Sequence, residues 1–204
     1  MIEYNNVTIT FDGKELIRNF SLSVKSGEKV VLTGPSGAGK STLLNVLMGF
    51  VPSFKGEIKI NKIQLTPETL DKLRMQIAWL PQEPQIEAST VEKLIRFPFT
   101  FRNNNRLIPK IEDIINLLER FYLSPKILKN AVQNISGGEK QRILLISVLL
   151  LKRPVLLLDE PTSALDAESE KAISDYLLNK DDITVLSVSH DEKWIGKFGR
   201  QIKI

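Results

Sequence analysis

The stretch Gly34-Pro35-Ser36-Gly37-Ala38-Gly39-Lys40-Ser41-Thr42 decides how this chain folds. It fits the phosphate-binding pattern G-x-x-x-x-G-K-[ST], in which glycines let the backbone curl and direct its N–H groups inward. The preceding residues 29–33 are typical of a short strand, and residues 41–48 are typical of a helix. We expect Lys40 to reach the β- and γ-phosphates of a nucleotide and Ser41 to hold Mg²⁺. The alternative is a glycine turn that matches by chance, and the flanking strand and helix argue against it.

Composition sets broad limits on the class of protein. The chain has 204 residues, of which 42% are hydrophobic and 25% charged, as in one compact globular unit. No apolar run approaches the roughly 18 residues of a membrane-spanning helix, and the first residues lack the features of a signal peptide. The absence of cysteine excludes disulfides and thiolate metal sites. Because the net charge of +4 comes from scattered lysines, we expect no direct contact with nucleic acid.

The N-terminal part predicts mainly strands. Residues 7–11, 20–24 and 57–60 alternate in polarity, and Asp12-Gly13 predicts a turn between the first two runs. Pro52 breaks the pattern after the first helix. Thr66 and Pro67 predict the N-cap and first residue of a short helix, and residues 77–80 predict another strand.

The middle of the chain changes character. Strand signals are absent from residues 83–135, prolines divide the segment, and apolar residues between 111 and 121 recur at helical spacing. We therefore expect a helical subdomain at 83–135, inserted into a core that comprises residues 1–82 and 136–204. The whole chain is expected to form a single domain.

The α/β alternation resumes after this insertion. The sequence predicts helices at 141–151 and 167–178, strands at 155–158 and 183–188, and a final edge strand at 200–204. Every residue of 155–158 is apolar, as in a strand buried on both faces. The predicted fold is α/β, with a mainly parallel sheet, an antiparallel β portion from the N-terminal region and a helical arm.

Two carboxylates follow the buried strand at 155–158. Ligands of parallel sheets bind beyond the carboxyl ends of the strands, so Asp159 is placed to hold the metal ion, usually through water. Glu160 points elsewhere and, as a carboxylate close to the γ-phosphate, can accept a proton from the attacking water. The alternative is a solvated acidic turn, but the presence of a phosphate loop in the same chain favours the metal-binding and proton-accepting roles.

A second anion site is predicted at Ser136-Gly137-Gly138, where an N-cap and two glycines precede a helix. It lies about a hundred residues after the phosphate loop, so one chain cannot easily use both on one nucleotide. Two chains packed head-to-tail can, because each then closes the site of the other. The alternative is a capped helix start with a glycine hinge.

Taken together, these motifs resemble the nucleotide-binding domain of the ATP-binding cassette (ABC) family over essentially the whole chain. The matches follow the family order: Walker A at 34–42, the Q-loop at Gln82, the signature motif at Ser136-Gly137-Gly138, Walker B at 158–161, the D-loop at 163–166 and the switch histidine at His190. Two signature positions depart from the family pattern, since Ile135 replaces the usual leucine and Glu139 the usual glutamine.

The resemblance implies roles for single residues. Glu160 resembles the catalytic base, His190 the group that contacts the γ-phosphate, and Gln82 the residue that senses Mg²⁺ and water. Ser136 and Gly138 resemble the groups that bind the γ-phosphate of the opposing subunit's ATP. Asp166 resembles the residue that communicates across the dimer.

The role of one further residue, Phe11, has an alternative explanation. Phe11 lies where the family stacks an aromatic ring on adenine, although packing in the hairpin is an alternative.

The family also implies partners and a location. We expect a homodimer that sandwiches two ATP molecules with Mg²⁺ and powers a separate membrane permease from the cytoplasmic face of the membrane. The permease contact is expected near Gln82 and residues 83–102, where Phe97, Phe99 and Phe101 suit a partner groove and at least one packs in the core. The chain ends just after its last strand, so no C-terminal regulatory domain is expected.

The arm carries a finer resemblance. Thr90-Val91, Phe97-Pro98, Arg102-Asn103 and residues 118–121 are similar to the ATP-binding subunits of small putative iron-export ABC transporters. Two other classes stay open: a soluble ABC ATPase that acts on nucleic acid or the ribosome, and a P-loop kinase that does not need the Ser136 site.

Overall fold

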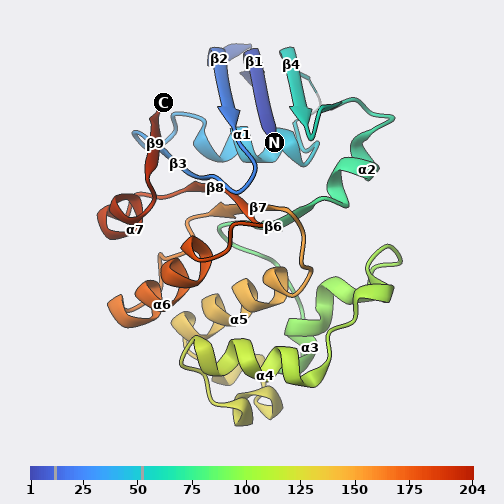
Figure 1. Cartoon of the computed structure of the whole chain (residues 1–204), viewed down its shortest axis with the longest axis vertical. Coiled ribbons are helices and arrows are strands. Elements are labelled where there is room, and N and C mark those ends of the chain that lie inside the picture. Colours follow the sequence, from blue (N-terminus) through green and yellow to red (C-terminus); the bar gives the residue numbers. More distant parts are fainter. Residues whose placement is uncertain (12, 52) are drawn as a thin grey trace.

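The computed structural model describes residues 1–11, 13–51 and 53–204 and contains two β-sheets (Figure 1). The antiparallel sheet has the order β2-β1-β4-β5, from β1 (Ile2–Phe11), β2 (Lys14–Val24), β4 (Lys55–Ile60) and β5 (Ile63–Gln64). The parallel sheet has the order β6-β7-β8-β3-β9, from β6 (Ile77–Leu80), β7 (Val155–Asp159), β8 (Thr184–Val188), β3 (Lys29–Thr33) and β9 (Arg200–Lys203). The predicted α/β architecture is confirmed, with the C-terminal tail as an edge strand. Asp12 and Pro52 lie outside the described residues.

The parallel sheet is buried on both faces, as its apolar strands predict. Helix α1 (Lys40–Leu47) packs between the two sheets, and alternate strand residues such as Val30 and Leu157 join this core. Their neighbours Val31 and Leu156 point to the opposite face and belong to a second hydrophobic core. The two cores together fix the register of every strand in the sheet.

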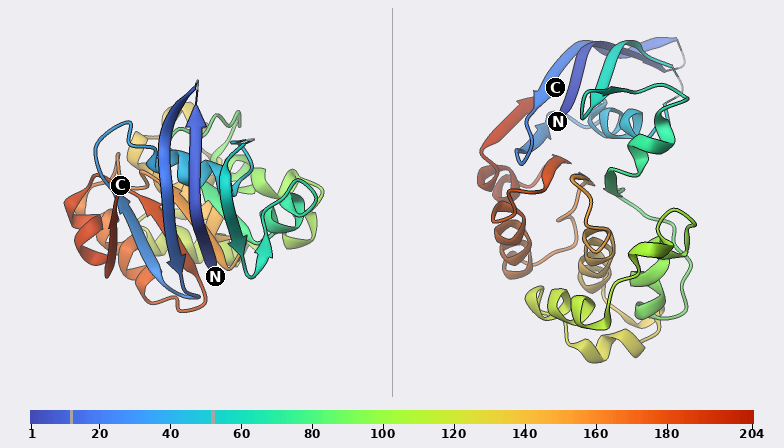
Figure 2. Two further views of the ribbon diagram at one scale, coloured as in Figure 1. Left: turned by 90° about the horizontal axis from the view of Figure 1, so that it is seen from above. Right: turned by 45° about the vertical axis from the view of Figure 1, so that its right-hand side comes forward.

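The opposite face of the parallel sheet carries α5 (Gly137–Leu149) and α6 (Ala167–Leu178), with α7 (Glu192–Lys197) close to α6. The helical arm contains α3 (Val91–Arg96), α4 (Ile111–Arg120) and the short 3₁₀ helices η1 (Phe97–Thr100), η2 (Asn105–Leu107), η3 (Pro125–Lys129) and η4 (Val132–Asn134). Figure 2 shows the arm at the end of the molecule farthest from the antiparallel sheet. Within the described ranges, no helix is long and apolar enough to cross a membrane.

Several predicted boundaries were wrong. Helix α2 (Leu70–Arg74) begins after Thr69, not at Thr66 and Pro67. The Thr69 hydroxyl accepts the Thr66 N–H (3.0 Å) and holds residues 66–69 in a turn, so the helix starts one turn later. Helix α5 begins at Gly137, directly after its N-cap Ser136, instead of at Gln141. Helix α7 and strand β5 were not predicted because both are very short.

A buried arginine connects the arm to the sheet. Arg153 is 8% exposed and donates to the carbonyls of Arg74 and Ile77, and to the Asn104 side chain. Its Nε has no hydrogen-bond partner among the residues that the structure describes, and burial lowers the pKa of the guanidinium. This cation therefore depends on neutral carbonyl and amide groups, which belong to the end of α2, the start of β6 and the loop after α3.

We expect Arg153→Met to lower the free energy of unfolding by about 3 kcal/mol, because it leaves the Arg74 and Ile77 carbonyls and the Asn104 amide without their donor. Urea denaturation followed by circular dichroism measures this change. Lys152→Met is the matched control, since the Lys152 side chain is 71% exposed, and we expect it to change stability by less than about 0.5 kcal/mol. Equal effects of both substitutions would contradict the anchoring role of Arg153.

Candidate functional site

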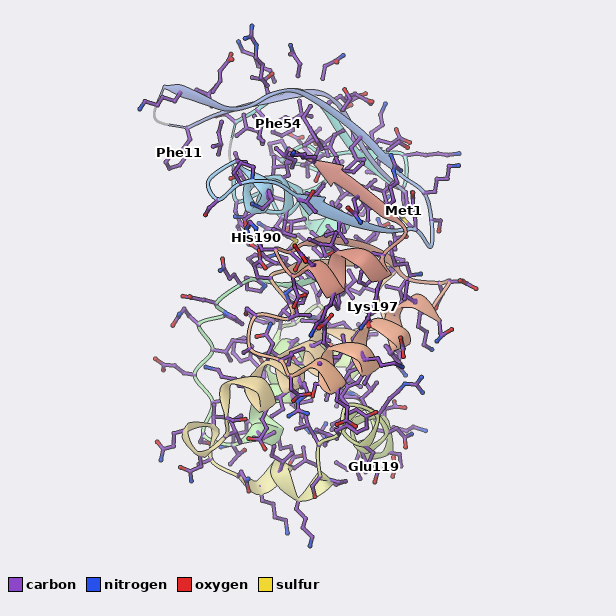
Figure 3. The ribbon with its side chains drawn as sticks, turned by 90° about the vertical axis from the view of Figure 1, so that its left-hand side faces the viewer. Met1, Phe11, Phe54, Glu119, His190 and Lys197 are labelled. Carbon is purple, nitrogen blue, oxygen red and sulfur yellow. The ribbon has the colours of Figure 1, made fainter. Side chains whose placement is uncertain are left out.

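One cavity of about 520 Å³ brings together residues of the phosphate loop with Gln82, Glu160 and His190. It opens at the carboxyl ends of β3, β6, β7 and β8, where the phosphate loop precedes α1. Figure 3 shows His190 at mid-height on the same side of the molecule as Phe11. The cavity is lined by Leu16, Ser36, Gly37, Gly39, Lys40, Ser41, Thr42, Gln82, Glu160, Ser163, Val188 and His190.

The phosphate loop needs glycine at two tight positions. Gly34 has a φ of 142°, and a Cβ there would lie 2.5 Å from the backbone oxygen of Ile204. Gly39, with a φ of 90°, precedes α1 as its N-cap, and a Cβ there would lie 2.7 Å from Cδ1 of Ile17. No side chain caps the first turn of α1. Its N–H groups, together with the positive end of the helix dipole, are therefore available to an anion.

Lys40 is held inside this loop. It is 5% exposed, and its Nζ donates to the carbonyls of Gly34 (3.0 Å) and Pro35 (2.8 Å). An ammonium group buried on neutral acceptors gains from a nearby anion, because charge-assisted hydrogen bonds are roughly twice as strong as neutral ones. The loop thus presents one positive charge to the cavity through Lys40.

Ser41 and Asp159 form the oxygen pair that the metal prediction requires. Ser41 Oγ donates to Asp159 Oδ1 (2.9 Å), and Asp159 is 5% exposed at the end of β7. Burial raises the pKa of the Asp159 carboxyl group, while the hydrogen bond from Ser41 and the charge of Lys40 lower it. A hydroxyl and a single carboxylate suit Mg²⁺ that is shared with phosphates. Accordingly, the described residues contain no cluster of three or more histidine, cysteine, aspartate or glutamate side chains that could hold a metal alone.

Glu160 and His190 face each other at the cavity wall. Glu160 has a φ of 48°, and its N–H donates to Val188 O (3.0 Å), which turns its side chain away from that of Asp159. Its carboxylate accepts the His190 N–H (3.3 Å) and lies 3.6 Å from His190 Nε2. Burial raises the pKa of Glu160, and the N–H and charge of His190 lower it. The pair places a carboxylate and an imidazole where the phosphate chain would end.

Gln82 lies between two hollows. It follows β6, lines the cavity of the phosphate loop, and also lines a second hollow of about 610 Å³. That second hollow is bounded by residues 82–87, Phe97 and the start of α5, including Gly137 and Lys140. Gln82 is therefore the point at which the two hollows meet.

The Ser136 turn is exposed and does not line the cavity of its own chain. Ser136 and Glu139 form a reciprocal capping box: the Ser136 N–H donates to Glu139 Oε2 (2.7 Å), and the Glu139 N–H donates to Ser136 Oγ (3.2 Å). This pairing explains how a glutamate is accommodated at Glu139. A Cβ at Gly138 would lie 2.8 Å from Ala164 O, so only glycine allows this close approach to the D-loop.

Arg142 links the Ser136 turn to the D-loop, a role that the sequence analysis missed. Its guanidinium donates to Gly138 O (3.3 Å), Phe121 O (3.2 Å) and Ser169 Oγ (2.8 Å). The Asp166 carboxylate caps α6 by accepting the Ser169 N–H (2.8 Å). The spacing of Arg142 from Gly138, one helical turn, is the sequence signal that points to this contact.

Phe11 does not line the cavity. It lies at the end of β1 opposite Lys14 and is 69% exposed, whereas Leu16 from β2 contributes to the lining. The adenine-stacking role of Phe11 therefore stays a prediction. The prediction for the arm aromatics is confirmed in one respect, because Phe99 is 4% exposed in the core and Phe101 is 54% exposed.

Comparisons with known proteins agree with this geometry. The family model described as "ABC transporter" matches residues 17–163. The probable iron export ATP-binding protein FetA of Escherichia coli (strain K12) is 32% identical over 207 residues, which cover 100% of this chain and 91% of that protein. The chain belongs to the ABC transporter family. It is an ATP-binding subunit that hydrolyses ATP.

Further relatives extend the comparison. The ATP-dependent lipid A-core flippase of Escherichia coli (strain K12) is 37% identical over 180 residues, covering 84% of this chain and 31% of that protein. The ATP-binding cassette MJ0796, in a dimeric post-hydrolysis state bound to ADP and Pi, matches with a TM-score of 0.84 at 28% identity, covering 100% of this chain and 94% of that one. An Atm1-family ABC exporter with ATP bound matches with a TM-score of 0.87 at 25% identity, covering 100% of this ABC subunit and 37% of that chain.

Glu139→Gln tests the capping box by its pH dependence. The Ser136 N–H lowers the pKa of Glu139 in the folded protein, so its stabilisation is present above the usual glutamate pKa and is lost as the pH falls through the folded value. We expect the variant to be less stable by under about 1 kcal/mol at pH 7, or roughly 2–4 °C in Tm, and equal to the wild type near pH 3. Glu119→Gln, on exposed α4, serves as control, and a pH-independent difference for Glu139→Gln would contradict the assignment.

Proposed function

We propose that two copies of this subunit sandwich two ATP molecules and drive a separate membrane permease. One observation carries the proposal: the phosphate-loop cavity and the exposed Ser136 turn are both formed, but they do not meet within one chain. The relative that binds ADP and Pi is described as dimeric, which supports the same arrangement. Ser136 and Gly138 of one subunit would then complete the γ-phosphate site of the other, and Asp166 would lie at the junction.

Within that site, each of the named residues of this chain would have its own role. Lys40 and the N–H groups at the start of α1 bind the phosphates, and Gln82 orients the attacking water. Glu160 accepts the proton of that water, while His190 holds the carboxylate of Glu160 in position. Ser41, Asp159 and Gln82 would hold Mg²⁺, which neutralises developing charge on the phosphate oxygens when bound. Phe11 would cover the adenine base.

The permease is proposed to bind in the second hollow, next to Gln82. Gln82 lines both this hollow and the nucleotide cavity. A partner segment bound in the hollow can therefore change the position of Gln82 next to the phosphates. The subunit would then lie on the cytoplasmic face of the membrane. The division into a core of residues 1–82 and 136–204 and a helical subdomain of 83–135 follows the same boundary.

The proposed transport direction is export, and the proposed substrate is a metal ion. The support is the full-length match to the probable iron export ATP-binding protein of Escherichia coli, which covers nearly all of both chains. Recovery of a multi-span protein with this subunit from detergent-solubilised membranes, followed by metal transport in vesicles, tests this assignment. Salt-sensitive RNA or DNA binding without any membrane partner would contradict it.

Glu160→Gln tests the composite site. We expect hydrolysis to fall by at least about 10²-fold, because the proton acceptor is removed, while ATP binding persists. The variant should therefore accumulate as an ATP-bound dimer, visible by size-exclusion chromatography with ATP and Mg²⁺. Glu119→Gln, on α4, should stay like the wild type. A Glu160→Gln protein that remains monomeric with ATP would contradict the sandwich.

Lys40→Ala tests the phosphate loop separately. Loss of the buried ammonium should weaken ATP binding by about 30-fold or more, as for other truncated charge pairs. Titration calorimetry with ATP measures the change, and thermal unfolding confirms that the variant is folded. An unchanged affinity would show that Lys40 does not contact the nucleotide.

A further inference from the structure

The segment between α3 and α4, residues 97–110, has an unusual composition. It carries Arg102, Arg106 and Lys110 but no aspartate or glutamate. Across residues 1–11, 13–51 and 53–204, none of these three cations takes part in an ion pair. This segment, called the arm loop from here on, projects from the side of the helical arm (Figures 1 and 2).

Three large apolar side chains next to these cations are exposed. Phe101 is 54% exposed, Leu107 is 43% exposed and Ile108 is 59% exposed. Single exposed apolar residues are common on protein surfaces, but here three of them fall within eight positions and flank two arginines. Apolar side chains next to unpaired cations are the composition of segments that bind the interface of a membrane.

The arm loop is held in this shape from inside. Phe99 is buried, and the buried Asn104 donates from Nδ2 to Pro98 O (2.8 Å) and accepts a hydrogen bond from Arg153. The Asn104 N–H donates to Phe101 O (2.9 Å), and the Leu107 N–H donates to Asn104 O (2.8 Å). The inner side chains therefore anchor the loop. Its outward apolar groups need little further ordering of the backbone when they bind a partner.

We propose that the arm loop binds an anionic phospholipid surface directly. Arg102, Arg106 and Lys110 contact the lipid phosphates, and Phe101, Leu107 and Ile108 enter the boundary between headgroups and acyl chains. A lipid surface fits better than a second protein segment because the loop projects outward, whereas the hollow next to Gln82 takes only Phe97 from it. Phe97 packs edge-on against Phe101 at 5.4 Å between ring centroids, so the lipid surface and that hollow would adjoin.

This inference rests on the proposed function in one point only, namely that coupling to a permease places the subunit next to a membrane. Its test needs no permease. The purified full chain is floated with vesicles of phosphatidylcholine alone or with one quarter phosphatidylglycerol, at low and high salt. ATP hydrolysis and permease co-purification are measured separately, so a failure of lipid binding is distinguishable from a failure of the proposed function.

We expect the wild type to float with the anionic vesicles at low salt, and weakly with neutral ones. The double variant Arg102→Gln, Arg106→Gln should bind roughly 25-fold more weakly, at about fivefold per cation. Ile108→Ser should reduce binding by roughly tenfold at unchanged charge. Lys126→Gln with Lys129→Gln, two exposed positions on η3, removes the same charge elsewhere on the arm and should leave binding unchanged.

A Phe101→Trp variant gives a second readout, since its emission should shift to the blue and be quenched by brominated lipid. Equal losses in the arm-loop and η3 double variants would show that adsorption depends only on net charge and would overturn the proposal. Absence of flotation would also overturn it. If the arm-loop variants float like the wild type but lose permease co-purification, the loop binds protein instead of lipid.

Discussion

The parallel pairing of β3, β8 and β7 is the constraint on which the site depends. The register pairs Leu32 with Val188 and Asp159 with Val188, so the ends of three strands reach the same edge of the sheet. That alignment brings Ser41 within hydrogen-bond distance of Asp159, although 118 positions separate them in the chain. A slip of one residue in β7 would turn Asp159 to the other face and separate the pair. The burial of the sheet on both faces makes such a slip unfavourable.

Much of the fold and site was accessible from the sequence because the relevant signals are local. The phosphate loop, the all-apolar strand β7 and the Ser136 cap each occupy a few consecutive residues, and the structure forms all three. The start of α2 was missed because Thr66 and Thr69 are both good N-caps, and a side-chain contact selects Thr69. Phe11 and Leu16 could not be separated either, since which of them reaches the cavity depends on how the β1–β2 hairpin crosses α1.

Two buried charged side chains at the nucleotide cavity lack a partner of opposite charge among the described residues. Lys40 is buried on backbone carbonyls, and Asp159 is buried on a single hydroxyl. Burial without full pairing costs free energy, which nucleotide phosphates and a divalent cation recover when they bind. Glu139 shows the contrast, because its charge is satisfied locally by Ser136 and serves the helix start. Lack of an opposite charge does not by itself identify a ligand site, because Arg153 is also buried on neutral groups. Lys40 and Asp159 differ from it in their place, since Lys40 lines the phosphate-loop cavity and Asp159 contacts Ser41 there.

Arg153 gives the arm a direct connection to the nucleotide cavity. Its guanidinium joins Asn104, within the arm loop, to the carbonyls of Arg74 at the end of α2 and Ile77 at the start of β6. Strand β6 then leads within four residues to the segment that begins at Pro81, and Gln82 lines the cavity. One buried cation therefore joins the arm loop to the segment that leads into β6. Because a buried guanidinium keeps its stabilisation only while all of its acceptors stay in place, the arm loop and the start of β6 should move as one body, although residues 82–90, which connect β6 to the arm along the chain, form no helix and no regular strand beyond the single bridge at Thr90.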